Sequence, residues 1–589
     1  MKQFIKFMFA SFFGVILAGI IFLVISLSII GAIISSTSKT QPPVKEDSVL
    51  VIKLDKPIYD REISNFSAGL GIGATGIDAS NSVGLTEFIE VINHAKNDPK
   101  IKAIMLDLSM IQANGWATIQ ELRDALEDFK SSKKKIYAYS DSYLQNSYYL
   151  STVADEIHLN PVGHVELKGL GAEILFIRDM LTKLDIDIDL IRPKNNAYKS
   201  AGEMYINDRM SPENKTQVKE YISSIWEHIA ANISKSRNID IKTLNDDVSS
   251  LKAFMPQDAL KNKFVDVLGF RTDLEEKIGK ELKNEKIKFV QYSNYRQSIT
   301  NLFPSSKDKI AVIYAYGGVS QGKGSDLSIG SDAIVKEIRK AVKSSSIKAI
   351  VLRINSGGGD AIASELMTNE VIKASKVKPI VVSMGDVAAS AGYEMACGAT
   401  KIFATPVTIT GSIGVFGVLP NVSKTLKKNL GISFDTIKTH DNSTFLTVTT
   451  AMTPDSRQAM QSNVESFYQN FITRVAVGRK LRVDFVDSIA RGRVWAAEDA
   501  KHLGLVDDYG GIKESIRSAA ELAKIKDYSI VMLPKTKDFA EQVLEMVSGG
   551  SQANLLRNEL GKSYDMFLEL KDISEIKGVQ ARLPYMINF

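Results

Sequence analysis

One serine in this chain stands in a setting that suits a nucleophile. Ser390 lies in MGDVAASAGYEMACGAT (384–400), among alanines and glycines that let a substrate backbone come close. A helix that starts at Ser390 would aim its free N–H groups at an oxyanion. The same pattern is also typical of a tightly packed helix start. No histidine lies near this serine in the sequence, so the chemistry depends on a base from another part of the chain.

The chain repeats itself. VGLTEFIEVINHAKNDPKIKAIMLDL (83–108) and SDAIVKEIRKAVKSSSIKAIVLRI (331–354) both read as a helix followed by a strand. Three more pairs follow in the same order: KIYAYS with PIVVSM, ADEIHLNP with ATKIFATP, and MPQDALKNKFVDVLG with WAAEDAKHLGLVDDYG. Short β-branched runs alternate with amphipathic helices in each half, which predicts parallel strands joined by helical crossovers. We therefore predict two tandem α/β domains.

The first half has no counterpart of Ser390. Its segment LQNSYYL places Gln145 or Asn146 opposite that serine, depending on where a one-residue gap falls. Ser147 is close by but aligns only with a further shift. A duplicated enzyme carries two copies of its site unless each copy supplies different residues to one shared site. The missing serine therefore raises the question of which residue the first half supplies.

Lys199 is the residue that only the first half carries. It lies in AYKSAGE, and the matching part of the second half has no lysine between Thr439 and Thr453. One half lacks the serine and the other lacks the lysine, so the economical explanation is one site shared across a pseudo-twofold axis. We predict that Lys199 is the base for Ser390.

Lysine can act as a general base only in its neutral form. At an ordinary pKa of about 10.4, about one lysine in 2,500 is neutral at pH 7, which corresponds to about 4.6 kcal/mol. Burial lowers a lysine pKa by up to about 3 to 5 units. The hypothesis therefore requires a desolvated pocket around Lys199.

Composition excludes several other classes of function. The net charge is only +5 and basic residues are scattered, so nothing predicts a nucleic-acid partner. The single cysteine, Cys397, excludes an internal disulfide and a cysteine-rich metal site. The six histidines form no metal-ligand spacing, and His158 and His164 are expected at the surface. GIGATG (71–76) follows no clear strand and is interpreted as a loop, not a dinucleotide site, so we predict no cofactor and no metal.

The amino terminus predicts a membrane anchor. Lys2 and Lys6 precede an uncharged run from Phe7 to Ile34, longer than the roughly 20 residues that a helix needs to span a bilayer. A cleaved signal peptide has a shorter apolar core and a small-residue cleavage site. The positive short end is expected in the cytoplasm and everything after Ile34 outside it. The polar, proline-containing stretch 35–48 is typical of a tether.

Three motifs make the chain similar to a known family. They are AYKSAGE around Lys199, RINSGGGDAIASE (353–365), and MGDVAASAGY through ITGSIGVFG (384–417). In these stretches the chain resembles the signal peptide peptidase A family in its long, double-domain, membrane-anchored bacterial form, and the match runs to about Gly511. These are serine/lysine peptidases of the Clp protease/crotonase-like superfamily. The resemblance implies that Ser390 is the nucleophile, Lys199 the general base, and Ser412 the hydroxyl that positions the lysine amine.

The resemblance also implies an oxyanion hole, with two departures from the family pattern. Gly358 and Ala391 would supply the backbone amides. The family has an S-P-G-G turn, whereas this chain has SGGG, with Gly357 in place of the proline. A glycine there leaves the turn freer in the unfolded chain. Asp360 stands where the family more often has a small or hydroxyl residue.

The family further implies an assembly, a substrate class and a location. We expect a homotetrameric bowl that opens towards the membrane and cleaves hydrophobic peptides, such as released signal peptides. The expected location is the bacterial inner membrane, with a single span and the catalytic domains on the periplasmic side. The predicted division of the chain is an anchor (1–34), a tether (35–48), a first domain (49–290), a linker (291–309), a second domain (310–530) and a helical tail (531–589).

Two other functions stay open at this stage. A crotonase-like enzyme would use the same fold and oxyanion turn on an acyl thioester, but it would need neither an unmatched serine and lysine nor an anchor. A non-catalytic membrane scaffold would keep the repeat and the anchor while losing the dyad. The retained Lys199, Ser390 and Ser412 favour the peptidase, although fold by itself does not fix the substrate.

Overall fold

The structure is a computed structural model that describes residues 6, 7, 14, 17, 21, 44–63, 82–113, 115–283, 287–535 and 579–582. Apart from five single residues, the predicted anchor lies outside these ranges, and so does GIGATG. Within the described ranges, no helix has the length and hydropathy needed to cross a bilayer.

The first half is built on a six-stranded parallel sheet. Its strands, in spatial order, are β10 (Lys288–Gln291), β1 (Ser48–Lys53), β4 (Ile101–Asp107), β6 (Lys135–Ser140), β7 (Glu156–Leu159) and β9 (Val267–Leu268). Helices of this half are α3 (Leu85–Asn97), α4 (Trp116–Lys130), α5 (Gln145–Ser151), α6 (Arg178–Lys183), α7 (Glu203–Ile206), α8 (Pro212–Arg237), α9 (Ile241–Ser249), α10 (Pro256–Lys261), α11 (Arg271–Glu281) and α12 (Tyr292–Ser298). The central strands are buried on both faces, as parallel strands between helical layers must be.

The second half repeats this sheet strand for strand. The corresponding order is β23 (Ser529–Leu533), β11 (Lys309–Tyr316), β15 (Ile347–Ser356), β17 (Ile380–Ala389), β18 (Lys401–Ala404) and β22 (Asp508–Tyr509), while β19 (Ile409–Gly411) and β21 (Val494–Ala496) extend from the end of β17. Its helices are α13 (Ser331–Lys343), α14 (Ala361–Ser375), α15 (Ala391–Cys397), α16 (Ser423–Leu430), α17 (Pro454–Arg479), α18 (Val483–Ile489), α19 (Ala497–His502) and α20 (Ile512–Ala523). The predicted tandem α/β organisation is confirmed.

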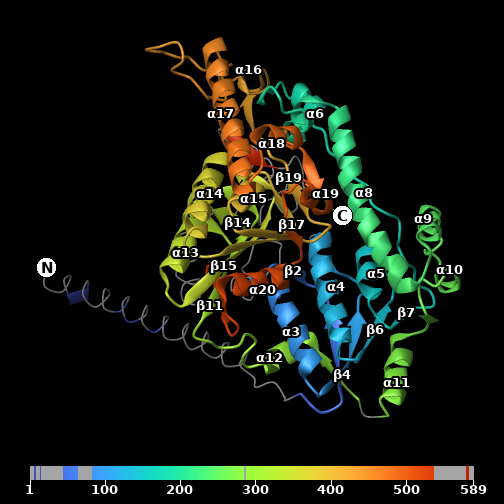
Figure 1. Ribbon diagram of the computed structural model, residues 1–589. Coiled ribbons are helices and arrows are strands. Elements are labelled where there is room, and N and C mark those ends of the chain that lie inside the picture. Colours follow the sequence, from blue (N-terminus) through green and yellow to red (C-terminus); the bar gives the residue numbers. More distant parts are fainter. Residues whose placement is uncertain are drawn as a thin grey trace.

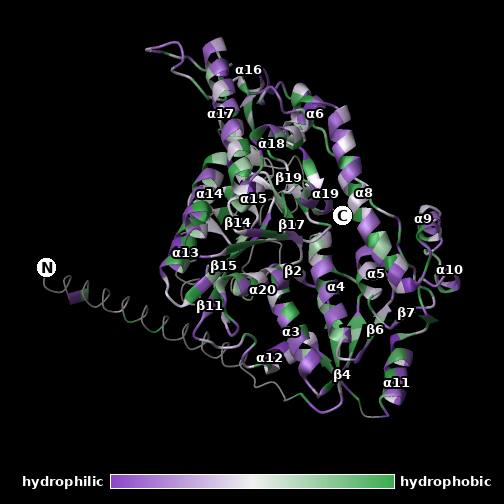
Figure 2. Cartoon of the chain, in the orientation of Figure 1, coloured by the Kyte–Doolittle hydropathy of each residue, from purple (hydrophilic) through white to green (hydrophobic). Residues whose placement is uncertain are grey.

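The repeat extends to the helix ends. Helices α8 and α17 each have 26 residues and begin with a proline after a capping hydroxyl, Ser211 or Thr453. Both end at a left-handed residue, Asn238 or Lys480. In Figure 2 the strands are largely green, whereas the surface helices carry purple residues on their outer side. The same caps and the same amphipathic pattern therefore build the same element twice.

Two small sheets also match each other. The first is β3 (Val83–Gly84), β2 (Pro57–Tyr59) and β5 (Gln112–Ala113), and the second contains β14 (Ser328–Gly330), β12 (Gly318–Ser320) and β16 (Gly358–Asp360). Only the second continues, through β24 (Val579–Arg582) and β20 (Phe416–Asn421) to β8 (Asp187–Ile191), and β13 (Gly324–Ser325) flanks its other end. Because β8 comes from the first half and β20 from the second, this sheet joins the two halves.

Two segments differ from the sequence prediction. The predicted linker, 291–309, contains helix α12, in which Tyr295 is buried. The predicted helical tail, 531–589, is described only at 531–535 and 579–582, where it forms parts of strands β23 and β24. The reason is pairing: β23 adds the apolar run SIVML to the edge of β11 in parallel register. The rest of the predicted helical tail lies outside the described residues.

The surface position predicted for His158 is wrong. This side chain is 2% exposed, and its Nε2 lies 2.5 Å from Glu156 Oε1. It lies on β7, where alternate side chains face the covering helices. Burial lowers the pKa of His158, so the residue is a buried core histidine and not a surface group.

A buried ion cluster holds the two halves together. Arg353, on β15 of the second half, lies 2.7 Å from Asp60 Oδ1 and 2.7 Å from Glu121 Oε1 of the first half. All three side chains are less than 5% exposed. Glu121 also accepts a hydrogen bond from the backbone N–H of Ile512. In Figure 1 helix α3 lies beside α4, which carries Glu121, and beside α20, which begins at Ile512, where the blue first half meets the red end of the second.

We expect Arg353→Met to destabilise the protein by about 3–5 kcal/mol, because it leaves two buried carboxylates without their counter-charge. Thermal and urea unfolding midpoints measure the change. Arg482→Met is the control, since the Arg482–Asp484 pair is exposed and should leave the midpoints almost unchanged. Equal midpoints for the two variants would show that the cluster does not hold the halves together.

Candidate active site

The amine of Lys199 lies between two serines of the other half. Its Nζ is 2.8 Å from Ser390 Oγ, 2.9 Å from Ser412 Oγ and 3.0 Å from the Ser412 carbonyl oxygen. All three side chains are fully buried. The structure thus brings together the three residues that the sequence assigned to nucleophile, base and support, from positions 191 and 213 residues apart along the chain.

The lysine is placed by a short loop that is fixed to both halves. Lys199 follows β8 and precedes a 3-10 turn at Ser200–Gly202. The backbone N–H of Tyr198 donates to the Arg491 carbonyl, 3.0 Å away in the second half. The Asn196 amide donates to the Val415 carbonyl, also across the boundary, at 3.0 Å. The docking of the halves therefore sets the position of the amine.

Ser390 occupies a strained turn between β17 and α15. Its φ is +55° and its ψ is −119°, in a region that non-glycine residues rarely adopt. Its N–H donates to the Gly411 carbonyl at 2.8 Å, which holds the turn. A serine on a sharp strand-to-helix turn has its Oγ at the end of the sheet, beside the first N–H groups of the helix. This geometry suits a nucleophile better than a simple packed helix start.

Ser412 also has a positive φ, +50°, directly after Gly411 at +76°. Its N–H donates to the Arg493 carbonyl at 2.7 Å. Because both its carbonyl and its hydroxyl face Lys199, Ser412 can accept the two N–H bonds of a neutral amine. The remaining lone pair then faces the Ser390 hydroxyl, which is the arrangement a general base requires.

Burial lowers the pKa of Lys199. Removal of the ammonium from water holds the pKa of Lys199 well below its ordinary value of 10.5. The desolvated pocket that the sequence argument required is therefore present. The neutral amine is favoured because charging it inside this pocket would cost more than charging it in water.

The oxyanion turn lies next to the nucleophile. Strands β15 and β17 pair through Ser356, the first residue of the SGGG turn, and Ala388, two residues before Ser390. A Cβ at Gly392 would come within 2.8 Å of the Ser356 carbonyl oxygen, so the small residue permits this close approach. Ala391 supplies the first N–H of α15.

Two residues at or beside the departures from the family turn make specific contacts or adopt special conformations. The Gly358 N–H donates to Ser356 Oγ at 3.1 Å, so a ligand oxygen would have to compete with that hydroxyl. Gly358 has a φ of +106°, which suits glycine. Asp360 caps helix α14, because its Oδ1 accepts from the Ala363 N–H at 2.7 Å. The aspartate thus has a structural role at this position.

Gln145 is the first-half counterpart of Ser390 by its contacts. Its amide donates to the Gly169 carbonyl at 3.0 Å and accepts from the Gly169 N–H at 2.9 Å. Gly169 corresponds in the repeat to Gly414, whose carbonyl oxygen lies 3.4 Å from Ser390 Oγ. The first half therefore has an amide near the position of the hydroxyl, but its helix α5 follows Leu144 at a φ of −71°, without the strained turn of Ser390.

Gly492 is a site residue that sequence reasoning missed. Its φ is +79°, and a Cβ there would lie 2.4 Å from Lys199 Cβ and 2.5 Å from the Lys199 backbone nitrogen. The glycine lets the second half cover the lysine closely enough to exclude water. In the sequence it is only a glycine between two arginines, and spacing alone does not connect it with a residue so far away.

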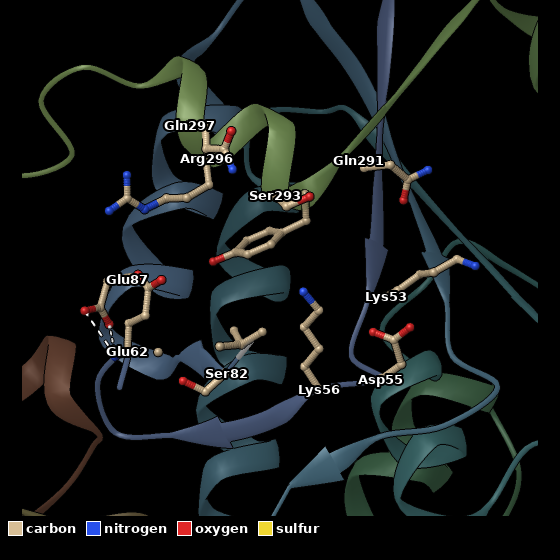
Figure 3. A pocket seen from close by; sticks show the side chains of 13 residues that line it. Lys53, Asp55, Lys56, Glu62, Ser82, Glu87, Gln291, Ser293, Arg296 and Gln297 are labelled. Atoms are coloured by element: carbon tan, nitrogen blue, oxygen red, sulfur yellow. Dashed lines mark hydrogen bonds between the residues drawn. The ribbon is translucent and has the colours of Figure 1, made fainter. Parts of the chain in front are cut away.

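A separate cavity of about 540 Å³ lies in the first half, away from the dyad. Figure 3 shows charged side chains around it, with the Glu87 carboxylate turned to the backbone of Glu62. Its lining includes Lys56 and Arg296 but none of the residues of the candidate active site. Burial raises the pKa of Glu87 to about 7. This cavity is therefore separate from the site formed by Lys199, Ser390 and Ser412.

Comparison with known proteins identifies the class. The family model for peptidase family S49 matches residues 128–285 and 372–526, one segment in each half. Protease 4 of Salmonella typhi is 33% identical over 86% of this chain and 83% of its own. Protease 4 of Haemophilus influenzae is 31% identical over 87% of this chain and 85% of its own. The chain belongs to peptidase family S49, and it is a serine-type peptidase.

A solved structure is similar only in part. The 1510-N membrane-bound stomatin-specific protease matches 39% of this chain and 100% of its own, with 14% sequence identity and a TM-score of 0.27. That likeness carries no argument about the site.

We expect activity to rise with pH through the lowered pKa of Lys199 and to level off well below pH 10.5, because only the neutral amine can accept the serine proton. A pH profile of kcat/KM for a peptide substrate measures this. We also expect Lys199→Met to be inactive yet more stable at neutral pH. The unfolded lysine binds a proton that the folded one does not, so this cost of folding disappears as pH rises towards 10.5. A stability difference independent of pH would contradict the buried neutral amine.

Gly492→Ala should lower kcat by about 10²-fold, since the new methyl group displaces the lysine backbone. Single-turnover hydrolysis at pH 8 measures the change. Gly504→Ala is the matched control, because Gly504 has a φ of +75° but its Cβ would meet only Leu481, at 3.5 Å. If both variants lose activity equally, backbone strain and not displacement of Lys199 is the cause.

Proposed function

We propose that the chain is a membrane-anchored serine endopeptidase that degrades cleaved signal peptides and similar hydrophobic peptides, with a Ser390/Lys199 dyad shared between its halves. The observation that carries this proposal is the 2.8 Å contact between Lys199 Nζ and Ser390 Oγ inside a fully buried site. Relatives at 31–33% identity are named proteases, and a shorter relative from Enterococcus faecium is named a putative signal peptide peptidase.

The chemistry follows from the positions of these groups. Ser390 Oγ attacks the peptide carbonyl carbon while neutral Lys199 accepts its proton, and Ser412 keeps the amine in place. The N–H groups of Ala391 and Gly358 stabilise the oxyanion. The lysinium then protonates the departing amine, and water resolves the acyl-enzyme with the same lysine as base.

An extended peptide as substrate is supported by the strand next to the site. Strand β24 lies between β16 and β20 and is antiparallel to both, with Arg582 opposite Gly358 and Val579 opposite Gly417. It therefore runs towards the oxyanion turn, as the residues before a scissile bond would. This slot offers main-chain partners on both sides, which is how an extended peptide adds to a sheet.

The same proposal includes an anchor, a location and an assembly. The uncharged run from Phe7 to Ile34 is the proposed single span in the bacterial inner membrane, with the catalytic halves on the periplasmic side. We further propose a homotetramer whose sites face its interior. The support is the resemblance to the signal peptide peptidase A family and the clustering of Lys2 and Lys6 before the run.

We expect the detergent-solubilised chain to cleave a synthetic signal peptide, and Ser390→Ala and Lys199→Ala each to lower kcat at least about 10²-fold. A fluorophosphonate probe should label the wild-type chain and not Ser390→Ala, with labelling much slower in Lys199→Ala. A chain that ends at Gly578 lacks β24 and tests whether this strand occupies the substrate position. Because substrate must displace β24 in the full chain, the shortened chain should cleave the peptide faster.

Circular dichroism and unfolding midpoints control for folding. Cleavage by both variants at the wild-type rate would reject the dyad. An inactive but well-folded wild-type chain would favour a scaffold, and hydrolysis of an acyl thioester in preference to peptide would favour the crotonase-like function.

A further inference from the structure

Helix α8 carries a buried amide at the boundary between the halves. Gln217 is the sixth residue of this helix and has no exposed surface. Figure 1 shows α8 as a long helix of the first half whose upper end reaches the second half, where it packs against β21. Burial of an amide is costly unless its polar atoms find partners, so the contacts of Gln217 indicate what this side chain holds.

The amide nitrogen of Gln217 contacts the segment that carries the catalytic lysine. Its Nε2 lies 3.1 Å from the Tyr198 carbonyl oxygen and 3.1 Å from Ser200 Oγ. A further contact at 3.1 Å reaches Asn214 Oδ1 on the same helix. Gln217 therefore binds the residues immediately before and immediately after Lys199.

The amide oxygen of Gln217 contacts the other half. It accepts a hydrogen bond from the backbone N–H of Val494, on β21, at 3.0 Å. The carbonyl of the preceding residue, Arg493, accepts from the Ser412 N–H at 2.7 Å. Ser412 in turn contacts the Lys199 amine through its hydroxyl and its carbonyl. One side chain thus joins the backbone around the base to the strand that fixes the partner of the base.

This amide has no counterpart in the repeat. Helices α8 and α17 have the same length and the same proline start, so Gln217 corresponds to the sixth residue of α17, Ala459. Ala459 is exposed. The second half has no lysine between Thr439 and Thr453, and it has no amide to hold one. Gln217 therefore occurs only in the half that supplies the base.

We propose that Gln217 is a positioning residue for the general base, which sets the place of Lys199 against Ser412 by binding both segments at once. The inference rests on the proposed Ser390/Lys199 dyad and adds to it a residue that acts through the lysine segment. Without this amide, the Val494 N–H and the Tyr198 carbonyl would each lose a buried partner. Buried polar groups that lack partners recruit water.

Water in this pocket would change the protonation of the lysine. The charged side chains around the segment are Arg192, Glu203 and Glu220 of the first half and Asp487, Arg491 and Arg493 of the second. Removal from water, and not any of these charges, lowers the pKa of Lys199. Entry of water would therefore raise this pKa towards its ordinary value, and the pH dependence of activity reports whether the pocket stays dry.

Gln217→Met tests the role in the full-length, detergent-solubilised chain, since it removes the amide and keeps a side chain of similar length. With a synthetic signal peptide at pH 7, we expect kcat to fall at least about 10-fold with KM nearly unchanged. The loss should shrink as the pH rises, because a higher pKa of Lys199 moves the profile of kcat to higher pH. Gln217→Glu keeps the shape, loses the N–H donors and should shift the profile in the same direction.

Gln145→Met is the matched control. Gln145 is also a buried amide bonded to backbone groups, but its partners are Lys168 and Gly169. This variant should lower the unfolding midpoint and leave the pH profile in place. If Gln217→Met also keeps the wild-type profile, or loses the same fraction of kcat at every pH, the positioning role is wrong. Where Gln217→Met does not fold, Gln217→Glu decides by the same criterion. An inactive wild-type chain, or full activity of Lys199→Ala, would instead reject the dyad itself.

Discussion

The burial of one amine constrains the rest of this structure. Lys199 has no exposed surface, and its pKa is lowered because water is excluded around it. Neither half can bury this amine alone, because Lys199 comes from the first half and the residues that cover it, including Gly492, come from the second. Exclusion of water therefore depends on how tightly the two halves dock, and the Arg353 cluster, itself buried across the same boundary, fixes that docking.

Duplication supplied the framework for this division. The two sheets have the same strand order, and the long helices α8 and α17 have the same length and the same kind of cap. The copies differ where chemistry is concerned: one turn presents the strained Ser390, and the other holds Gln145 against Gly169. The two halves thus share their sheets and long helices but differ at the positions of Ser390 and Lys199.

Strain and small residues are concentrated at the same place. Ser390 and Ser412 both have positive φ, and Gly358, Gly411 and Gly492 adopt conformations that favour glycine. Each is held by backbone hydrogen bonds or by contacts across the boundary, such as Ser412 N–H to the Arg493 carbonyl. The sheet that runs from β16 through β24 and β20 to β8 links these turns, so the positions of Lys199 and Ser390 and the pairing of β24 depend on the same backbone.

The sequence by itself determined the duplicated α/β fold and singled out the two residues of the proposed dyad. Periodicity reveals parallel strands and crossovers, and internal comparison isolates Ser390 and Lys199, because each is unmatched in the other half. Only the tertiary structure decided what surrounds them. The role of Gly492, the capping by Asp360, the burial of His158 and the strand character of β24 depend on contacts between residues far apart in the chain. Local pattern encodes which face of an element is apolar, whereas the identity of the element that covers it follows from packing of the whole chain.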